Sequence, residues 1–99
     1  MKRRVVIFSP EARSDLLRLY DWIAASAGAR VAIGYIDRLE SYCLGLDLAS
    51  ERGYRRDDIR AGLRIIGFEK RVTIAFTVGD DDATILRLFY GGQDWEATL

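Results

Sequence analysis

The feature that most constrains the fold of this chain is a change of hydrophobic period along its length. Between residues 12 and 46 apolar residues recur at helical spacing, whereas residues 63–90 carry short β-branched and aromatic runs. A period near 3.6 is typical of an amphipathic helix, and a period of about 2 is typical of a half-buried strand. The sequence therefore predicts helices first and a sheet afterwards.

A short strand precedes the helical part. Residues 5–8 are β-branched and aromatic, and they end at Ser9-Pro10, where proline cannot continue a strand ladder but suits the first turn of a helix. Ser9 is a suitable N-cap, and Glu11 and Asp15 place negative charge near the positive end of the helix dipole. This pattern predicts a strand that runs directly into a helix.

Two apolar stripes follow, separated by Gly28. They consist of Ala12, Leu16, Leu19 and Ile23, and then of Ala32, Ile36, Leu39, Cys43 and Leu46. Each stripe covers one helix face and glycine commonly ends a helix, so we expect a hairpin of two amphipathic helices, the first ending at about Ser26. Secondary stripes are formed by Leu17, Tyr20 and Ala24, and by Val31, Tyr35 and Tyr42.

Three β-rich runs complete the chain at residues 63–68, 72–78 and 83–90, with breaks of hairpin length between them. We expect consecutive antiparallel strands, with the apolar side chains of the middle run on one face: Val72, Ile74, Phe76 and Val78. Ile85 and Phe89 share the parity of Arg87 and should face the other side. That apolar surface is either open to a partner or covered by flanking loops.

The order of elements predicts a two-layer α+β architecture. An N-terminal strand, an antiparallel two-helix hairpin and a three-stranded antiparallel meander would complete one sheet. A chain of 99 residues supports one hydrophobic core, so we expect a single domain spanning residues 1–99.

Charge is balanced overall but unevenly spread. Residues 52–71 hold seven basic side chains against three acidic ones, and residues 72–99 hold one against five. Residues 49–60 have turn formers and no apolar periodicity, so they are predicted to be an arginine-rich loop. Two interpretations stay open: a basic surface for an acidic partner, or a solvated face with internal arginine–carboxylate pairs.

Composition argues against several classes of function. With Cys43 as its single cysteine and no histidine, the chain offers no disulfide and no cysteine cluster for zinc, so we expect no metal or cofactor. The apolar run at residues 5–8 is far shorter than a signal peptide core or a membrane span, which favours a cytoplasmic protein without a membrane partner. Gly91-Gly92 is not followed by the lysine and helix of a phosphate-binding loop.

Three local motifs lie at the start of the first predicted helix, at the start of the second predicted strand and at the end of the last one. They are Phe8-Ser9-Pro10-Glu11-Ala12-Arg13 followed by Asp15-Leu16, then Gly62-Leu63-Arg64, and finally Leu86-Arg87-Leu88-Phe89-Tyr90-Gly91-Gly92-Gln93-Asp94. Because the motifs occur in this order and at this spacing, the chain resembles the ParE/RelE superfamily of type II toxins over nearly its full length. The resemblance is closest to the ParE branch, which implies a toxin with DNA gyrase as its usual target and a ParD-like antitoxin that neutralises it.

The chemistry of RNA cleavage separates the two branches, because RelE-like toxins cut messenger RNA. That reaction needs a base, an acid and cations around the phosphate, yet histidine is absent and arginine is effectively always protonated. Arg64 matches an arginine that the ribonuclease branch uses on phosphate, but Gln93 occupies the region where a second catalytic arginine is usual. We therefore expect a binding toxin without catalytic residues. The alternatives are a ribonuclease acting through Arg64, Lys70 and Tyr90, or a non-toxic binding module.

The contact surfaces are expected on the arginine-rich loop, the C-terminal segment and the helical hairpin. For the target we expect Arg56, Arg60, Arg64, Gln93, Asp94 and Trp95. For the antitoxin, which should lie across the hairpin and pair its acidic groups with arginines, we expect Leu17, Tyr20, Tyr35, Tyr42, Arg55, Arg56 and Arg60. No sequence-specific nucleic-acid binding is expected.

Several of these residues also have a purely structural interpretation. Tyr90 continues the apolar run of its strand, Trp95 is expected to dock back onto the sheet, and Trp22 is expected at the margin of the core. Arg64 could form a salt bridge with a nearby carboxylate: Asp57, Asp58 or Asp94.

Overall fold

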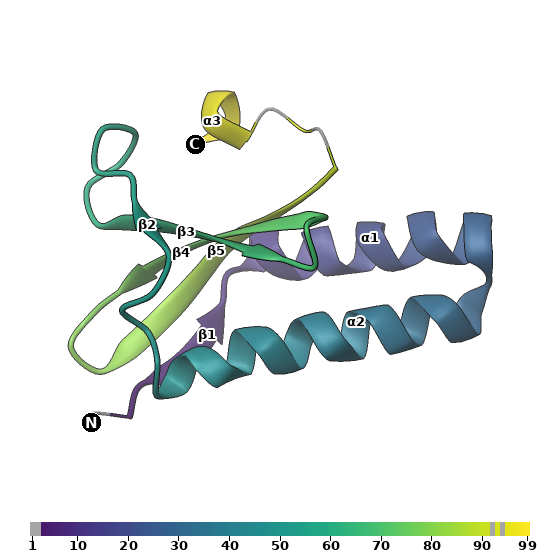
Figure 1. Ribbon diagram of the computed structural model, residues 1–99, viewed down its shortest axis with the longest axis horizontal. Coiled ribbons are helices and arrows are strands. Elements are labelled where there is room, and N and C mark those ends of the chain that lie inside the picture. The colour runs from purple at the N-terminus through teal and green to yellow at the C-terminus, as the bar shows by residue number, and fades with distance from the viewer. Residues whose placement is uncertain (1–2, 92, 94) are drawn as a thin grey trace.

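One mixed sheet organises the molecule. The structure, a computed structural model, describes residues 3–91, 93 and 95–99. Its elements are β1 (Val5–Phe8), α1 (Pro10–Ala27), α2 (Ala29–Leu44), the short 3₁₀ helix η1 (Gly45–Asp47), β2 (Tyr54–Arg55), β3 (Leu63–Phe68), β4 (Val72–Val78), β5 (Asp82–Tyr90) and α3 (Trp95–Thr98). The strand order is β1-β5-β4-β3-β2, with β1 parallel to β5 and the other neighbours antiparallel. The helical hairpin packs on one face, so the predicted two-layer α+β architecture is confirmed (Figure 1).

The helical hairpin begins and turns where the sequence indicates. The Ser9 hydroxyl accepts the Ala12 N–H (3.0 Å) as an N-cap, and it also donates to the Leu86 carbonyl (2.8 Å), which ties the helix start to the sheet. Gly28 ends α1 and precedes α2 with φ of +95°, a region that side chains other than glycine rarely adopt. Its N–H bonds the Ala24 carbonyl at 3.0 Å.

The main core lies between the hairpin and the sheet. The predicted stripes of both helices meet the inward-facing side chains of β4, so Val72, Ile74 and Phe76 are buried there as expected. Leu88 and Ile85 extend this layer on β5. Burial of this continuous apolar surface is the main force that holds the two layers together.

The register of β4 and β5 shifts within the pair. Ala75 lies opposite Arg87, but the next residue, Phe76, lies opposite Ile85, so Leu86 is an extra residue on β5. A bulge of this kind reverses the face to which the side chains beyond it point.

The shared face predicted for Ile85 and Phe89 is wrong because of this bulge. Ile85 is fully buried in the helix-side core, whereas Phe89 is buried in a second cluster on the opposite face. Alternation read from the sequence assumes an uninterrupted period of two, and an inserted residue breaks it.

The arginine-rich segment is not a loop throughout, which corrects a second expectation. Tyr54 and Arg55 form β2, which pairs with Ile65 and Arg64 of β3. Gly53 makes this approach possible, because a Cβ at that position would collide with the Ile65 carbonyl oxygen, and its φ is +75°. Two paired residues carry no apolar periodicity, so the sequence gives no strand signal here.

The second face of the sheet carries a small core of its own. Leu63, Ile65, Ala75 and Phe89 are buried there. Ile59, Leu86, Trp95 and Leu99 pack against them, so the arginine-rich segment and α3 cover part of this face. The prediction that Trp95 docks onto the sheet is confirmed, and flanking segments cover the apolar surface. α3 lies across the sheet from the hairpin (Figure 1). None of the helices in the described part of the chain is long and apolar enough to cross a bilayer.

Candidate functional site

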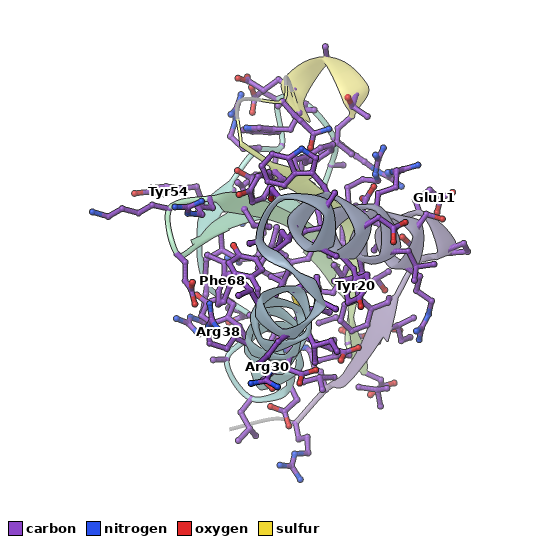
Figure 2. The ribbon with its side chains drawn as sticks, turned by 90° about the vertical axis from the view of Figure 1, so that its right-hand side faces the viewer. Glu11, Tyr20, Arg30, Arg38, Tyr54 and Phe68 are labelled. Atoms are coloured by element: carbon purple, nitrogen blue, oxygen red, sulfur yellow. The ribbon has the colours of Figure 1, made fainter. Side chains whose placement is uncertain are left out.

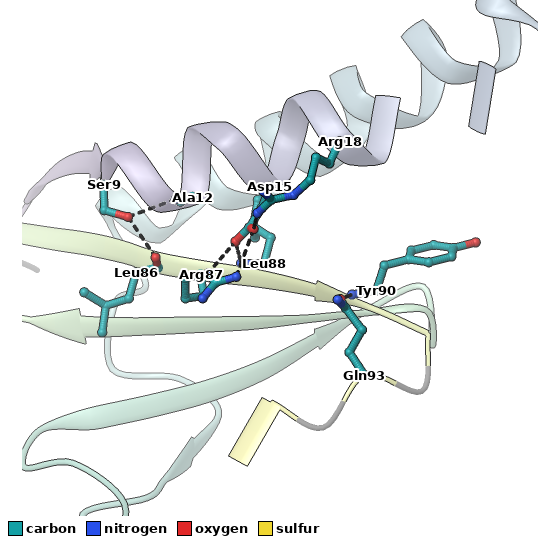
Figure 3. Close-up of polar contacts among 9 residues, drawn as sticks. All are labelled: Ser9, Ala12, Asp15, Arg18, Leu86, Arg87, Leu88, Tyr90 and Gln93. Atoms are coloured by element: carbon teal, nitrogen blue, oxygen red, sulfur yellow. Dashed lines mark hydrogen bonds and ion pairs between the residues drawn. The ribbon is translucent and has the colours of Figure 1, made fainter. Parts of the chain in front are cut away.

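The C-terminal half of β5 is an edge of the sheet. β1 pairs with β5 only as far as Ile85, so residues 86–90 have no neighbouring strand on the side of α1. Two side chains accept the outward N–H groups: the Asp15 carboxylate takes the N–H of Leu88 (2.9 Å), and the Gln93 amide oxygen takes the N–H of Tyr90 (2.7 Å) (Figure 3). An exposed edge is thus closed by side chains.

Asp15 is the centre of a buried polar joint between α1 and β5. Its side chain is 5% exposed, and it accepts hydrogen bonds from Arg87 Nε (2.8 Å) and from Arg18 Nη2 (2.8 Å) in addition to the Leu88 N–H. Burial by itself would raise the pKa of Asp15, but the hydrogen bonds from Arg87, Leu88 and Arg18 outweigh it and hold the pKa below its usual value.

This joint gives Asp15 a role that the sequence does not indicate. The residue was expected to act through the helix dipole; besides Arg18 on its own helix, its hydrogen-bond donors are Arg87 and Leu88 of β5, the latter at a sequence separation of 73. Hydrogen bonding to Asp15 also raises the pKa of Arg87. With all these donors directed at it, the carboxylate acts as a structural anchor.

Arg56 connects the arginine-rich segment to the C-terminal helix. Its guanidinium pairs with Asp58 (3.0 Å) and Glu96 (2.9 Å) and lies over the Trp95 ring, 5.3 Å from its centroid. The hydrogen bonds that Arg56 donates to these two carboxylates raise the pKa of Arg56, and Arg56 in turn lowers the pKa of Asp58. Two residues predicted for target binding, Arg56 and Trp95, are thus in contact with each other.

Internal ion pairs neutralise two arginines of the basic segment. Arg55 pairs with Asp57 at 3.1 Å, and the pKa of Asp57 is lowered first by the Gly62 N–H and then by Arg55. The side chain of Arg64 donates to the Arg52 carbonyl (3.3 Å), so the salt bridges considered for Arg64 with Asp57 and Asp58 are replaced by pairs with the neighbouring arginines. The interpretation as internal arginine–carboxylate pairs therefore holds for Arg55 and Arg56.

The structure places the residues predicted to bind the target on different faces of the sheet. Arg64 alternates along β3 with Leu63 and Ile65, which point into the second core, so its side chain faces away from Trp95. Gln93 caps β5, Arg60 is exposed, and Asp94 lies outside the described residues. Arg56 and Trp95 remain together at α3, and Arg60 follows Arg56 on the same segment, where its N–H bonds the Arg56 carbonyl.

The apolar residues predicted for the antitoxin do not form one exposed patch. Leu17 is exposed (69%), but Tyr35 is buried and packs edge-on against Phe68, which Tyr42 also contacts. Tyr20 lies on the opposite side of the hairpin from Phe68 (Figure 2). Side chains that share a helix stripe in sequence are separated by the packing of the hairpin on the sheet.

The residues of the ribonuclease alternative are also apart. Tyr90 lies opposite Val72 near the β3–β4 turn that contains Lys70, whereas Arg64 lies four residues up β3 from Phe68 at that same end. At about 3.3 Å per residue the separation along the strand is on the order of 13 Å. The backbone positions of the three residues therefore do not converge on one point.

Trp22 and Tyr90 form a site that sequence reasoning missed. Trp22 is 56% exposed, and its ring packs against that of Tyr90 at an interplanar angle of 59°, with centroids 4.6 Å apart. A hollow lies on each side of this pair, one of about 730 Å³ next to Asp15 and one of about 650 Å³ next to Tyr35. The sequence indicated only that Trp22 lies at the margin of the core. It could not indicate the contact with Tyr90, because the two residues are far apart in the chain.

No histidine, cysteine, aspartate or glutamate cluster suited to a metal ion occurs among the residues that the structure describes. The arrangement instead consists of hydrogen-bonded anchors, arginine-lined surfaces and exposed aromatic side chains. Arginine and aromatic side chains of this kind are enriched in protein interfaces. The fold and these surfaces define the class: a small two-layer α+β domain that presents arginine and aromatic side chains on its surface.

Comparisons with known proteins identify the family. Residues 6–95 match the family described as "ParE toxin of type II toxin-antitoxin system, parDE". Toxin ParE3 of Caulobacter vibrioides is 29% identical over 94 residues, which span 95% of this chain and 93% of that protein. The chain therefore belongs to the family of ParE toxins of type II toxin–antitoxin systems.

Two solved structures share the fold. A chain of the chromosomal ParDE toxin–antitoxin system of P. aeruginosa superposes with a TM-score of 0.79 at 20% identity, covering 90% of this chain and 97% of the other. A chain of the RelBE2 toxin–antitoxin complex of Mycobacterium tuberculosis gives a TM-score of 0.64 at 19% identity, covering 94% and 97%.

Proposed function

We propose that this ParE-type toxin inhibits DNA gyrase by binding to it and is neutralised by a ParD-like antitoxin. The observation that carries the proposal is the match to the ParE toxin family over residues 6–95. The P. aeruginosa relative comes from a ParDE system, which supports a ParD-like partner for this chain. Gyrase acts on the chromosome, so the proposal places the protein in the cytoplasm.

The group around α3 is the proposed target surface. Trp95 is half-buried, with Arg56 stacked on its ring, and Arg60 is exposed nearby on the same segment. A large aromatic side chain beside arginines is typical of the residues that dominate binding energy in protein interfaces. Arg64 faces the other side of the sheet and is assigned no part in this surface.

Inhibition by binding is favoured over RNA cleavage. The ribonuclease alternative needs Arg64 close to Lys70 and Tyr90, and their spacing along the sheet opposes that. Tyr90 is engaged by Arg71 Nη1 at 3.3 Å and by the ring of Trp22, which is a packing environment. The mechanism we propose is occupancy of gyrase without covalent chemistry.

A supercoiling assay with purified gyrase tests the proposal. We expect micromolar protein to inhibit supercoiling and Trp95→Ala or Arg60→Gln to weaken inhibition by about tenfold or more, since such side chains contribute most at interfaces. Arg13→Gln removes the same charge from an exposed position on α1 and should leave inhibition unchanged. Intact supercoiling at micromolar protein would exclude the gyrase target.

Two cellular assays separate the alternatives. Primer extension on messenger RNA after induction should show no discrete cuts, and cuts within minutes would favour the ribonuclease. Growth arrest on induction should be relieved by co-expression of a short acidic ribbon-helix-helix protein from the same operon, which should co-purify with the toxin. Unimpaired growth with gyrase unaffected would favour the non-toxic binding module.

A further inference from the structure

The two edge strands of the sheet differ in how well they are protected. β2 has only two residues, Tyr54 and Arg55, and it lies in the arginine-rich segment, so its open side is short and charged. β1 consists of four apolar residues, with neither a charge nor a proline inside the strand. Proteins usually protect an edge with charges, proline or a very short strand, because open main-chain groups pair with other chains. By this criterion β2 is protected and β1 is not.

The outer side of β1 presents main-chain groups that no neighbouring strand uses. The Val5 N–H points toward β5 and donates to the Asp81 carbonyl (2.9 Å), whereas the Arg4 N–H points outward and donates to η1 (2.7 Å). Because strand residues alternate, the N–H and C=O groups of Val6 and Phe8 also point outward. No hydrogen bond reaches these groups from the residues that the structure describes. Val6 and Phe8 are therefore open to a further strand.

Apolar side chains line this edge on both faces of the sheet. Val6 and Phe8 are half-buried against the main core. Alternation directs Val5 and Ile7 to the other face, where they are 65% and 44% exposed. α3, which covers part of that face, lies away from β1 (Figure 1, Figure 2). A strand added at this edge would bury apolar surface on both faces.

The charges around β1 suit a second copy of this chain in antiparallel orientation. Arg3 and Arg4 precede the strand, and Glu11 follows it. The Arg3 side chain is 72% exposed, although it pairs with Asp47 at 3.2 Å, and Glu11 is exposed at the start of α1. An antiparallel pair places the arginines of one copy near the glutamate of the other. A parallel pair would place like charges side by side, which is unfavourable.

The register of such a pair follows from the free donors. A centre at Val6 would set Phe8 opposite Arg4, whose N–H already bonds to η1. A centre at Phe8 would set Val6 opposite Pro10, which has no N–H. Only a centre at Ile7 sets Val6 of each copy opposite Phe8 of the other, so that all the free groups of the edge are paired.

We propose that two copies of this chain associate through β1 and form one continuous sheet across a twofold axis at Ile7. Val6 exchanges main-chain hydrogen bonds with Phe8 of the second copy, and the two Ile7 side chains meet on the exposed face. Val5 extends this apolar contact diagonally to Ile7 of the second copy. One short strand from each copy makes a small interface, so the dimer is weak, with a Kd on the order of 100 µM.

Cysteine cross-linking of the full chain tests the register. The natural Cys43 is fully buried, and burial raises the pKa of its thiol to about 12, so it stays unreactive. In the dimer the two Ile7 Cα atoms lie about 4.5 Å apart, which a disulfide spans, whereas the two Val5 Cα atoms lie about 13 Å apart. Ile7→Cys at about 200 µM should form a disulfide-linked dimer on mild oxidation, and the more exposed Val5→Cys should not. Equal cross-linking of both variants, or none of Ile7→Cys, overturns the proposal.

Amide hydrogen exchange gives a second measurement, on the natural protein. At about 1 mM the amides of Val6 and Phe8 should exchange several-fold more slowly than at about 20 µM, because they are paired only in the dimer. The Val5 amide, which already donates toward β5, should show no such dependence. Exchange that is independent of concentration at Val6 and Phe8 overturns the proposal. If an antitoxin alone protects these two amides, the edge takes a strand of another protein instead.

A charge placed on the edge separates association from folding. Ile7→Lys should be monomeric at about 1 mM in sedimentation equilibrium, because an exposed lysine opposes strand pairing. Val31→Lys introduces the same charge at a comparably exposed position on α2 (53%) and should associate as the natural protein does. The thermal midpoint of Ile7→Lys shows that the variant is folded. A natural protein that is monomeric at about 1 mM, or an Ile7→Lys variant that still dimerises, overturns the proposal. Neither gyrase nor an antitoxin takes part in this contact.

Discussion

Two arginine–carboxylate systems in this molecule have similar geometry and different surroundings. In the joint between α1 and β5, Arg87 meets Asp15 at 2.8 Å, and the two side chains are 23% and 5% exposed. In the C-terminal system, Arg56 meets Glu96 at 2.9 Å, and these side chains are 29% and 56% exposed. The distances alone would rank the two pairs as equals.

The difference lies in what water can do for the carboxylate when its partner is lost. If Arg87 is lost, the buried Asp15 carboxylate cannot be hydrated in its place. If Asp15 itself is lost, the buried Leu88 N–H is left without an acceptor. Glu96 remains largely solvated if Arg56 is absent, and exposed pairs of this kind contribute little to global stability. The first system therefore holds the two layers together, while the second sets the position of a four-residue helix.

The largest expected effect comes from neutralising the buried carboxylate. Asp15→Asn keeps the shape but loses the charge that Arg87 and the Leu88 N–H share, so we expect a loss of about 2–4 kcal/mol in the free energy of unfolding. Urea denaturation followed by circular dichroism measures this. Asp21→Asn, at an exposed position of the same helix, is the control and should change stability by less than about 0.5 kcal/mol. Equal losses in both variants would break the comparison.

The pH dependence of stability sharpens the same point. The folded pKa of Asp15 lies below its unfolded value of about 3.9, so its contribution is complete above about pH 5 and is lost as the pH falls through the folded pKa. The stability difference between the natural protein and Asp15→Asn should therefore be constant from about pH 5 to 7 and shrink in acid. Denaturation at a series of pH values checks it, and a difference that grows in acid would contradict the assigned ionisation.

The smallest expected effect is local. A helix of four residues has no independent stability, so α3 depends on its docking contacts. Arg56→Gln should speed amide hydrogen exchange in residues 95–99 several-fold and raise the pKa of Asp58, while the urea midpoint stays close to that of the natural protein. Arg60→Gln, an exposed neighbour, serves as the control. A drop in global stability comparable to that of Asp15→Asn would show that the two systems are equivalent after all.

The sequence by itself determined the order and identity of most elements. The strand at residues 5–8, the N-cap at Ser9, the stop at Gly28 and the strands at residues 63–68 and 72–78 all agree with the structure. Each of these signals is local: backbone preference, capping and hydrophobic period act between residues that are close in the chain. The motifs carried by these elements were also sufficient to indicate the toxin family, which the match over residues 6–95 bears out.

Only the tertiary structure decided which side chains meet. The bulge at Leu86, the docking of β2 through Gly53 and the anchor of Asp15 on β5 depend on residues distant in sequence. Their positions follow from how the hairpin packs on a twisted sheet, and no periodicity in the chain encodes that geometry. Asp15 shows the limit most directly, since the same residue that suits the first turns of a helix became the buried link to a strand at the other end of the chain.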